Sequence, residues 1–428
     1  MIMKETFHSF IFLLTSFLFI VNSLSGQNLT TAPAEEIGFS KNRLIRIDNV
    51  FNDYVKNQKM AGSVILVARK GKVAYYKSFG YRDIESDSPM QKDAIFRIAS
   101  QTKAIVSVGI MILQEEGKLL IQEPVSKYIP EFEKTTVAKP DGNGGYSITQ
   151  ANREINIHDL LTHTAGIGYG YGPAEAEWEQ AGIQDGYFAN RDEPISKTIE
   201  KIASLPMDAQ PGTEWIYGYS TDILGVVIER ASGMALNKFL QTRIFDPLAM
   251  KDTYFYLPGD KVDRLATVYV PEEGKPLKSA SRKEQTMNGQ GDYVEGPRKS
   301  FSGGAGLLST AKDYYLFLQM LANEGELNGE RILSRQSVNL MTTDHLGSKI
   351  KFRDGEGFGL GFSVVTNKGL RGTLGSIGEY GWGGAYGSTY WIDPVEDLIV
   401  VYFTQLRPYS IVKDQLMLRT LIYQSLTD

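Results

Sequence analysis

A serine three residues before a lysine is the spacing in this sequence with the clearest potential for chemistry. Its occurrences include Ser100 with Lys103, Ser309 with Lys312 and Ser410 with Lys413. On a helix such residues share one face, with Cβ atoms about 5–6 Å apart. The lysine amine can then take the proton of the serine hydroxyl, which would let the serine attack a carbonyl group and form a covalent intermediate.

Among these three pairs, the surroundings favour Ser100 as the nucleophile. Ser309 precedes Asp313 and an amphipathic segment, which predicts a helix N-cap with a solvated Lys312. Ser410 follows a proline and is expected to open the last helix. After Ser100, the run 104–113 is apolar almost all round and is typical of a buried helix. We therefore expect burial to lower the pKa of Lys103 from about 10.4 toward about 7, leaving a free amine as the base.

Several other chemistries are excluded or disfavoured. The chain has no Cys, which excludes disulfides, thiolate metal sites and a cysteine nucleophile. No H-E-x-x-H or G-x-S-x-G motif is present, and His163 is expected to pack or cap at the end of a helix. The net charge of −5, with no long basic run, argues against nucleic acid as a partner. We expect no metal and no cofactor.

The elements that must position these residues follow from hydrophobic periodicity. Strands are predicted at 63–68 and 73–79, and again at 359–365, 387–392 and 398–404, while the region from 98 to 250 is helix-rich. Helices are predicted at 41–55, 310–324 and 410–424, and a polar loop at 281–304. Strands at both ends of the chain predict one antiparallel sheet with a helical lobe inserted, an α+β fold.

The N-terminus has the composition of a secretory signal. An apolar stretch at 10–21 is followed by small residues up to Gly26, which predicts cleavage near 26–27 and a linker at 27–37. The stretch is shorter than the roughly 20 residues that span a bilayer. We expect a secreted or periplasmic protein with no stable membrane insertion after cleavage.

Several motifs occur in an order that resembles the serine β-lactamase-like hydrolases, which include class C β-lactamases, D-Ala-D-Ala peptidases and family VIII carboxylesterases. The resemblance covers about residues 38–425 and rests on 96–103, 116–119 with 124–128, 157–166, and 211–217 with 222–225. It implies a β-lactamase/transpeptidase-like fold, with an antiparallel sheet flanked by the N- and C-terminal helices. Its α/β lobe would comprise about 38–98 and 300–425, and its helical lobe about 99–299.

The resemblance also implies roles for individual residues. Ser100 would be the acylated nucleophile, Lys103 its activating amine and Tyr217 the proton relay, although Tyr219 lies only two residues further on. Trp382, Gly383, Gly384 and Ala385 stand where the family has Lys-Thr-Gly or His-x-Gly. The backbone N–H groups of Ser100 and Ala385 would form the oxyanion hole. A strand-end packing role is the alternative for Trp382.

Two departures from the family pattern bear on the substrate. Tyr217-Gly218-Tyr219 replaces Tyr-Ala-Asn or Tyr-Ser-Asn, and Trp382 replaces a lysine that binds carboxylates. Both remove groups that recognise penicillins and peptides. The sequence therefore predicts a serine hydrolase that cleaves small carboxylic esters through an acyl-enzyme. A β-lactamase or D-Ala-D-Ala carboxypeptidase acting on an amide, and a non-catalytic penicillin-binding-like module, remain as alternatives. The segments 166–173 and 281–304 are expected to border the pocket.

Overall fold

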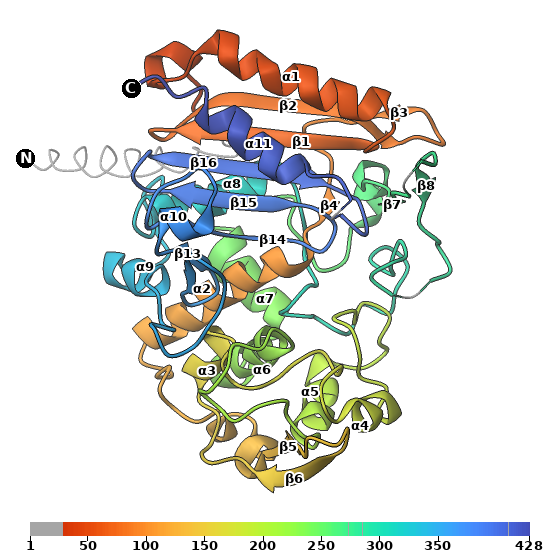
Figure 1. The fold of residues 1–428 in the computed structure, drawn as a ribbon, viewed down its shortest axis with the longest axis vertical. Helices are drawn as coiled ribbons and strands as arrows, with labels where there is room; N and C mark the ends of the chain where they lie inside the picture. Colours follow the sequence, from red (N-terminus) through yellow and green to blue (C-terminus); the bar gives the residue numbers. More distant parts are fainter. Residues whose placement is uncertain (1–28, 273, 285, 410) are drawn as a thin grey trace, which may run out of the picture.

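A computed structural model describes residues 29–272, 274–284, 286–409 and 411–428. The predicted signal segment therefore lies outside the described residues. An eight-stranded antiparallel sheet forms the centre of the molecule, in the order β12-β13-β14-β15-β16-β1-β2-β3 (Figure 1). Its strands are β1 (Gly62–Arg69), β2 (Lys72–Asp83), β3 (Ser88–Pro89), β12 (Glu356–Phe358), β13 (Ser363–Val365), β14 (Tyr380–Gly383), β15 (Thr389–Asp393) and β16 (Leu398–Thr404).

Strands from both ends of the chain meet at the centre of this sheet. β1 pairs with β16 in register from Ser63–Thr404 to Arg69–Leu398. Both strands are buried along their whole length, because their alternate side chains enter two different cores. A strand covered on both faces has no polar face, which is why each reads as a continuous apolar run. The α+β arrangement expected from the sequence is confirmed.

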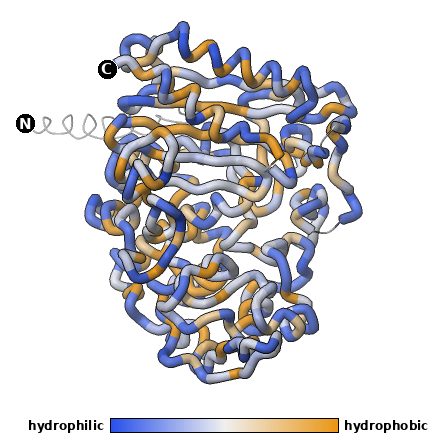
Figure 2. Tube along the Cα trace, in the orientation of Figure 1, coloured by the Kyte–Doolittle hydropathy of each residue, from blue (hydrophilic) through white to orange (hydrophobic). Residues whose placement is uncertain are grey.

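One face of the sheet is covered by the first and last helices, α1 (Lys41–Lys56) and α11 (Asp414–Tyr423), which contact each other (Figure 1). α1 alternates hydrophilic and hydrophobic residues along its turns (Figure 2) and buries Leu44, Ile47 and Phe51. The core under these helices includes Trp391 and Tyr402 of the sheet.

The other face packs against the helical part of the chain. Its helices are α2 (Thr102–Glu115), α3 (Ile157–Leu161), α4 (Glu175–Gln180), α5 (Ile195–Ala203), α6 (Ser220–Ser232), α7 (Leu236–Leu240), α8 (Ala311–Ala322) and α9 (Arg335–Met341). A further short helix, α10 (Lys368–Arg371), lies in the connection from β13 to β14 and buries none of its residues. α2 is buried from Thr102 to Leu113 and packs on α6. No helix in the described ranges is both long enough and apolar enough to cross a bilayer.

In the described ranges, four short strand pairs lie in the connections and were not predicted from the sequence. They are β4 (Phe96–Arg97) with β9 (Leu308–Ser309), β5 (Thr136–Pro140) with β6 (Tyr146–Gln150), β7 (Tyr269–Val270) with β8 (Lys278–Ser279), and β10 (Glu326–Leu327) with β11 (Glu330–Arg331). The pair β4–β9 matters for function, because β4 leads directly into the turn that carries Ser100.

Three sequence predictions about element boundaries are wrong. The expected strand at 359–365 is a turn followed by β13, since Gly361 has φ 96° and Gly359 N–H donates to Phe362 O. Ser309 is not an N-cap: it is a buried residue of β9, and the cap of α8 is Thr310, whose Oγ1 accepts the Asp313 N–H at 3.1 Å. The last helix begins at Asp414 rather than at 410.

Candidate active site

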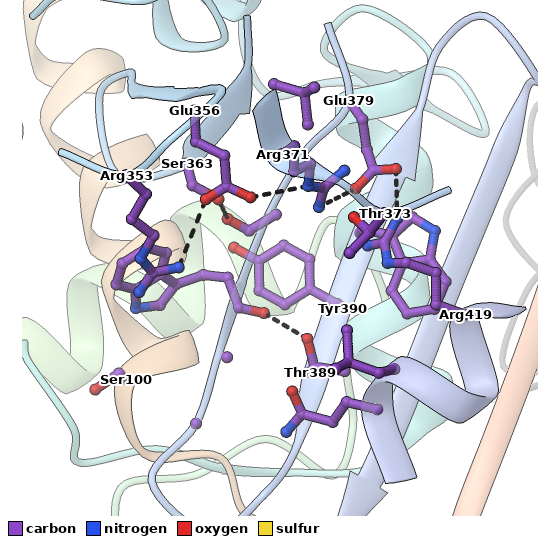
Figure 3. A pocket seen from close by; sticks show the side chains of 18 of the residues that line it. Ser100, Arg353, Glu356, Ser363, Arg371, Thr373, Glu379, Thr389, Tyr390 and Arg419 are labelled. Carbon is purple, nitrogen blue, oxygen red and sulfur yellow. Dashed lines mark hydrogen bonds and ion pairs between the residues drawn. The ribbon is translucent and has the colours of Figure 1, made fainter. Parts of the chain in front are cut away.

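A cleft of about 780 Å³ opens where the start of α2 meets the edge of β14. Ser100, Tyr217, Trp382, Gly383, Gly384 and Ala385, all singled out from the sequence, line it. In Figure 3, Ser100 and Arg353 lie toward one end of the cleft, while Arg371, Glu379 and Arg419 lie toward the other. The structure therefore brings together residues that are spread over nearly 300 positions of the sequence.

Ser100 is presented to the cleft by a strained turn. Ala99 has φ 44°, a left-handed conformation that costs energy for a residue with a Cβ atom. The turn Ala99–Gln101 links β4 to α2. Every residue from Ala94 to Leu113 is buried except Ser100. The fold thus exposes the one hydroxyl that the sequence predicted as the nucleophile.

Lys103 lies directly behind Ser100 and is 2% exposed. Its Nζ donates to Ser100 Oγ at 3.4 Å, to Tyr169 OH at 3.1 Å and to Gly304 O at 2.9 Å. An ammonium group has three N–H donors, and each of them has an acceptor here. The site is therefore built to hold Lys103 in its charged form.

The electrostatics agree with this geometry and contradict the prediction of a free amine. Burial alone lowers the pKa of Lys103, but the oxygens of Tyr169, Tyr217 and Asp222 raise it by more. The net pKa of Lys103 therefore lies above its ordinary value. The sequence showed the burial of this helix but not the partners that gather around its lysine.

Asp222 is one of those partners, and sequence reasoning did not assign it a role. It is buried near the start of α6, where its Oδ1 accepts Ser302 Oγ–H at 2.6 Å and Gly304 N–H at 3.0 Å. Gly304 thus joins the two charges, since its N–H binds Asp222 and its carbonyl binds Lys103. Burial raises the pKa of Asp222, and the charge of Lys103 opposes that rise.

Tyr217 contacts Lys103 through its ring, with Nζ 4.6 Å from the ring centroid. Its hydroxyl accepts Trp382 Nε1–H at 3.1 Å. The hydroxyl that contacts the ammonium directly belongs to Tyr169, a residue that the sequence placed only in a loop expected near the pocket. The Tyr169 ring packs edge-on against Tyr217, with centroids 5.7 Å apart.

Tyr219, the other aromatic of this segment, faces away from the site. It is fully buried, stacks on Trp178 at 5.9 Å and donates its hydroxyl hydrogen to Asp185 O. Between the two tyrosines, a Cβ atom on Gly218 would lie 2.3 Å from Ile167 O, so no larger residue fits. The spacing argument that preferred Tyr217 to Tyr219 thus agrees with the positions of both rings.

The edge of β14 is open beside Ser100. β13 pairs with β14 only at Ser363–Gly381 and Val364–Tyr380, and the next residues, Trp382 to Ala385, line the cleft. A Cβ atom on Gly384 would lie 2.5 Å from Ile98 O, so glycine is needed for the edge to approach the nucleophile turn this closely. A substrate can therefore lie along this edge within reach of Ser100.

Trp382 both lines the cleft and packs among aromatic rings. Its ring centroid is 5.5 Å from that of Tyr217 and 5.3 Å from that of Phe358. Both roles considered for this residue therefore apply, since Trp382 is an apolar wall of the cleft and also packs against other rings.

His163 is buried beside Tyr217, with ring centroids 4.8 Å apart, and burial lowers its pKa well below the ordinary value. Its predicted packing role is confirmed.

The loop 281–304 lies behind the cleft rather than along it. None of its described residues lines the cleft. Its end reaches the site through Gly304 and Ser302, which bind Lys103 and Asp222, and its middle through Asn288, whose Oδ1 accepts Arg407 Nε–H at 2.7 Å. Across the described ranges, no three His, Asp or Glu side chains converge on a point where a metal ion could bind.

Comparisons with a family model, with curated proteins and with solved structures each find matches that cover most of the chain. A family model described as Beta-lactamase matches residues 47–422. Esterase EstB of Burkholderia gladioli is 31% identical over 371 residues, covering 84% of this chain and 89% of that protein. Lovastatin esterase of Penicillium rubens is 30% identical over 381 residues, covering 82% and 90%. Among solved structures, EstCE1, described as a hydrolase with promiscuous acyltransferase activity, has a TM-score of 0.75 at 27% identity and covers 89% of this chain and 99% of that one.

Proposed function

The chain belongs to the beta-lactamase family and has the β-lactamase/transpeptidase-like fold, and from this premise we propose that it cleaves small carboxylic esters through an acyl-enzyme on Ser100. The observation that carries the proposal is the meeting of Ser100, Lys103, Tyr217 and the open edge of β14 around one cleft. Two relatives that match most of the chain are named as esterases.

In the proposed reaction, Ser100 Oγ attacks the ester carbonyl and loses its proton to the group formed by Lys103 and Tyr217. The backbone N–H groups of Ser100 and Ala385 hold the oxyanion, and the departing alcohol takes a proton back through Tyr217. Water then hydrolyses the acyl-enzyme to release the acid. Because Lys103 is held as an ammonium at rest, one proton must leave this group first, and we expect kcat/KM to rise with pH.

The same residues favour esters over penicillins and peptides. Trp382 gives the cleft an apolar wall where the family's lysine would bring a charge, and its indole N–H is already bonded to Tyr217. Tyr219 stands where the family has its asparagine, and it is buried in the core. An ester needs neither the amide contact nor the carboxylate contact that these two positions would supply.

We also propose that the protein is exported, on the strength of the apolar segment at 10–21 followed by small residues. N-terminal sequencing of protein secreted by its natural host, or recovered from its periplasm, tests this. A mature N-terminus near Gln27 is the expected result, and retention of residues 1–26 would contradict it.

The central test compares rates on a short-chain 4-nitrophenyl ester, a chromogenic cephalosporin and a D-Ala-D-Ala peptide. We expect the ester to be turned over fastest and Ser100→Ala to reduce its hydrolysis to a trace. Ser309→Ala, which removes another serine of the Ser-x-x-Lys spacing outside the cleft, is the matched control and should keep the activity. A fluorophosphonate should add to the wild type at Ser100, as located by peptide mass spectrometry. Substantial ester hydrolysis by Ser100→Ala would refute the mechanism.

A further inference from the structure

The cleft is lined by more basic than acidic side chains. Four arginines and three acidic residues contribute to it: Arg353, Arg371, Arg407, Arg419, Asp354, Glu356 and Glu379. The chain as a whole has a net charge of −5, so this balance is opposite in sign to that of the molecule. The question is which of these charges remain available to a ligand.

Two of the arginines, Arg371 and Arg419, are neutralised by ion pairs with Glu356 and Glu379. Arg371 Nε lies 2.9 Å from Glu356, Arg371 Nη2 lies 2.9 Å from Glu379, and Arg419 Nη1 lies 2.7 Å from Glu379. This cluster lies toward the end of the cleft away from Ser100 (Figure 3). Its charges are satisfied internally, so it offers little attraction to a substrate.

Arg353 lies at the same end of the cleft as Ser100 (Figure 3). Its guanidinium carbon is 5.2 Å from the Trp382 ring centroid and 4.8 Å from that of Phe352. Its side chain is 59% exposed, and its ion-pair partner Glu356 is 3.6 Å away and bound more closely by Arg371. A guanidinium that stacks on a ring keeps its N–H edge free to bind an anion.

Arg407 lies at the other end of the open strand edge. Its Nε donates to Asn288 Oδ1 at 2.7 Å and its Nη1 donates to Ala385 O at 3.4 Å. Within the described part of the chain, no carboxylate lies within ion-pair distance of it. The two guanidinium groups therefore mark the two ends of the segment from Trp382 to Ala385, along which a substrate would lie.

We propose that Arg353 and Arg407 each offer a guanidinium group to an anionic group at their own end of the substrate, so that the preferred substrates are esters carrying a carboxylate. The proposal rests on the proposed ester hydrolysis and names its substrate class. The sequence alone predicted that Trp382 in place of a lysine removes recognition of anions. In the structure, two arginines from other segments bring positive charge back to the same strand, one stacked on Trp382 itself.

The test uses pairs of esters that differ only in charge. One pair places the carboxylate on the acyl side: 4-nitrophenyl hydrogen glutarate and its methyl ester. The other places it on the alcohol side: 4-acetoxybenzoate and its methyl ester. The measured quantity is the ratio of kcat/KM for the anionic ester to kcat/KM for the neutral one. Dividing the ratio of each variant by that of the wild type cancels the intrinsic reactivity of the esters.

We expect the wild type at low salt to prefer the anionic member of at least one pair, and that pair tells on which side of the ester the carboxylate is bound. The double variant Arg353→Gln/Arg407→Gln should lower the preference about tenfold, as for the loss of a charge-assisted hydrogen bond. Arg353→Lys/Arg407→Lys should restore part of it, and salt should weaken it. Lys351→Gln, which removes an exposed charge two residues before Arg353 that does not line the cleft, is the matched control and should keep the full preference.

The outcomes separate this proposal from the function on which it depends. Hydrolysis of the neutral esters with no preference for either anionic ester would refute the proposal and leave ester hydrolysis standing. A preference that survives in the double variant, with an unchanged melting temperature, would also refute it. Failure to hydrolyse any of the four esters would instead refute the proposed function.

Discussion

Neutralising Asp222 should shift the pH dependence of ester hydrolysis while leaving the architecture of the site in place. Asp222→Asn removes the buried negative charge but keeps an oxygen at Oδ1, the atom that accepts both Ser302 Oγ–H and Gly304 N–H. The turn that orients Gly304 O toward Lys103 should therefore persist. What changes is the field at the ammonium, because Asp222 is one of the groups that raise the pKa of Lys103.

The size of the expected pKa shift of Lys103 follows from the short separation between its ammonium and the carboxylate of Asp222. One residue, Gly304, separates them, and opposite charges at such range commonly move a pKa by about one to two units in a protein interior. Removing the negative charge makes the proton on Lys103 easier to lose. The acidic midpoint of the kcat/KM profile should therefore move about one to two pH units lower. At high pH the plateau should fall severalfold, because the amine becomes a weaker base.

The assay is a pH profile of kcat/KM on a neutral 4-nitrophenyl ester, with melting temperature measured alongside. The other groups that face the Lys103 ammonium are Tyr169, Tyr217 and His163, and all are retained in the variant. Ser302→Ala is the matched control, since it removes a hydrogen bond to the same oxygen and keeps the charge, so its midpoint should move much less. An unmoved midpoint in a normally folded Asp222→Asn protein would show that this reasoning about Lys103 is wrong.

Three further predictions concern individual residues. Tyr169→Phe removes the hydroxyl that is 3.1 Å from Lys103 Nζ and keeps the ring packing, so kcat should fall about 10–100-fold with little change in KM, as measured by steady-state kinetics. Gly384→Ala places a Cβ atom 2.5 Å from Ile98 O and should cost about 100-fold in kcat/KM, whereas Gly383→Ala, with its nearest contact at 3.3 Å, should be milder; equal effects would contradict this. Burial raises the pKa of Asp414 to about 6, so the folded state keeps that proton over a pH range in which the unfolded chain, with a pKa of about 3.9, has lost it. The ionised, buried carboxylate therefore lowers the free energy of unfolding by about 3 kcal/mol. This loss of stability is absent below about pH 4, grows as the pH rises and is complete above about pH 6. Asp414→Asn should consequently raise the melting temperature more at pH 7.5 than at pH 4, and a pH-independent difference would contradict the shift.

The elements that the sequence predicted well are those with one unambiguous hydrophobic pattern. β16 matches its predicted bounds, and α1 extends one residue beyond them, because an apolar run or a helical stripe decides each of them locally. The errors occur where adjacent residues could each fill the same structural role, or where a turn interrupts an apolar run. Either Ser309 or Thr310 could cap α8, and the pairing of β9 with β4 decides between them. The predicted strand at 359–365 is interrupted at Gly361, and no apolar periodicity shows such a turn.

For the active site, spacing along the chain predicted the nucleophile but not its electrostatics. Ser100 and Lys103 are three residues apart, so a local motif brings them together. The acceptors that fix the charge of Lys103 come from positions 66 and 201 residues further along the chain. Burial was visible in the sequence, and alone it would lower the pKa; the opposing partners depend on tertiary packing. A prediction from burial alone therefore gave the wrong sign.

The departure from the family pattern at 218 and 219 has a structural cause in the neighbouring loop. Ile167 O and Gly168 O would lie 2.3 and 2.4 Å from a Cβ atom at position 218, so the loop occupies the space of that side chain. The same loop places Tyr169 between Tyr217 and Tyr219, at 5.7 and 4.9 Å from their rings, with its hydroxyl on Lys103. Glycine at 218, a core tyrosine at 219 and a phenol on the lysine thus belong to one rearrangement. The sequence indicated a lost asparagine, whereas the structure supplies a new polar contact from a different segment, and the Tyr169→Phe variant measures its value.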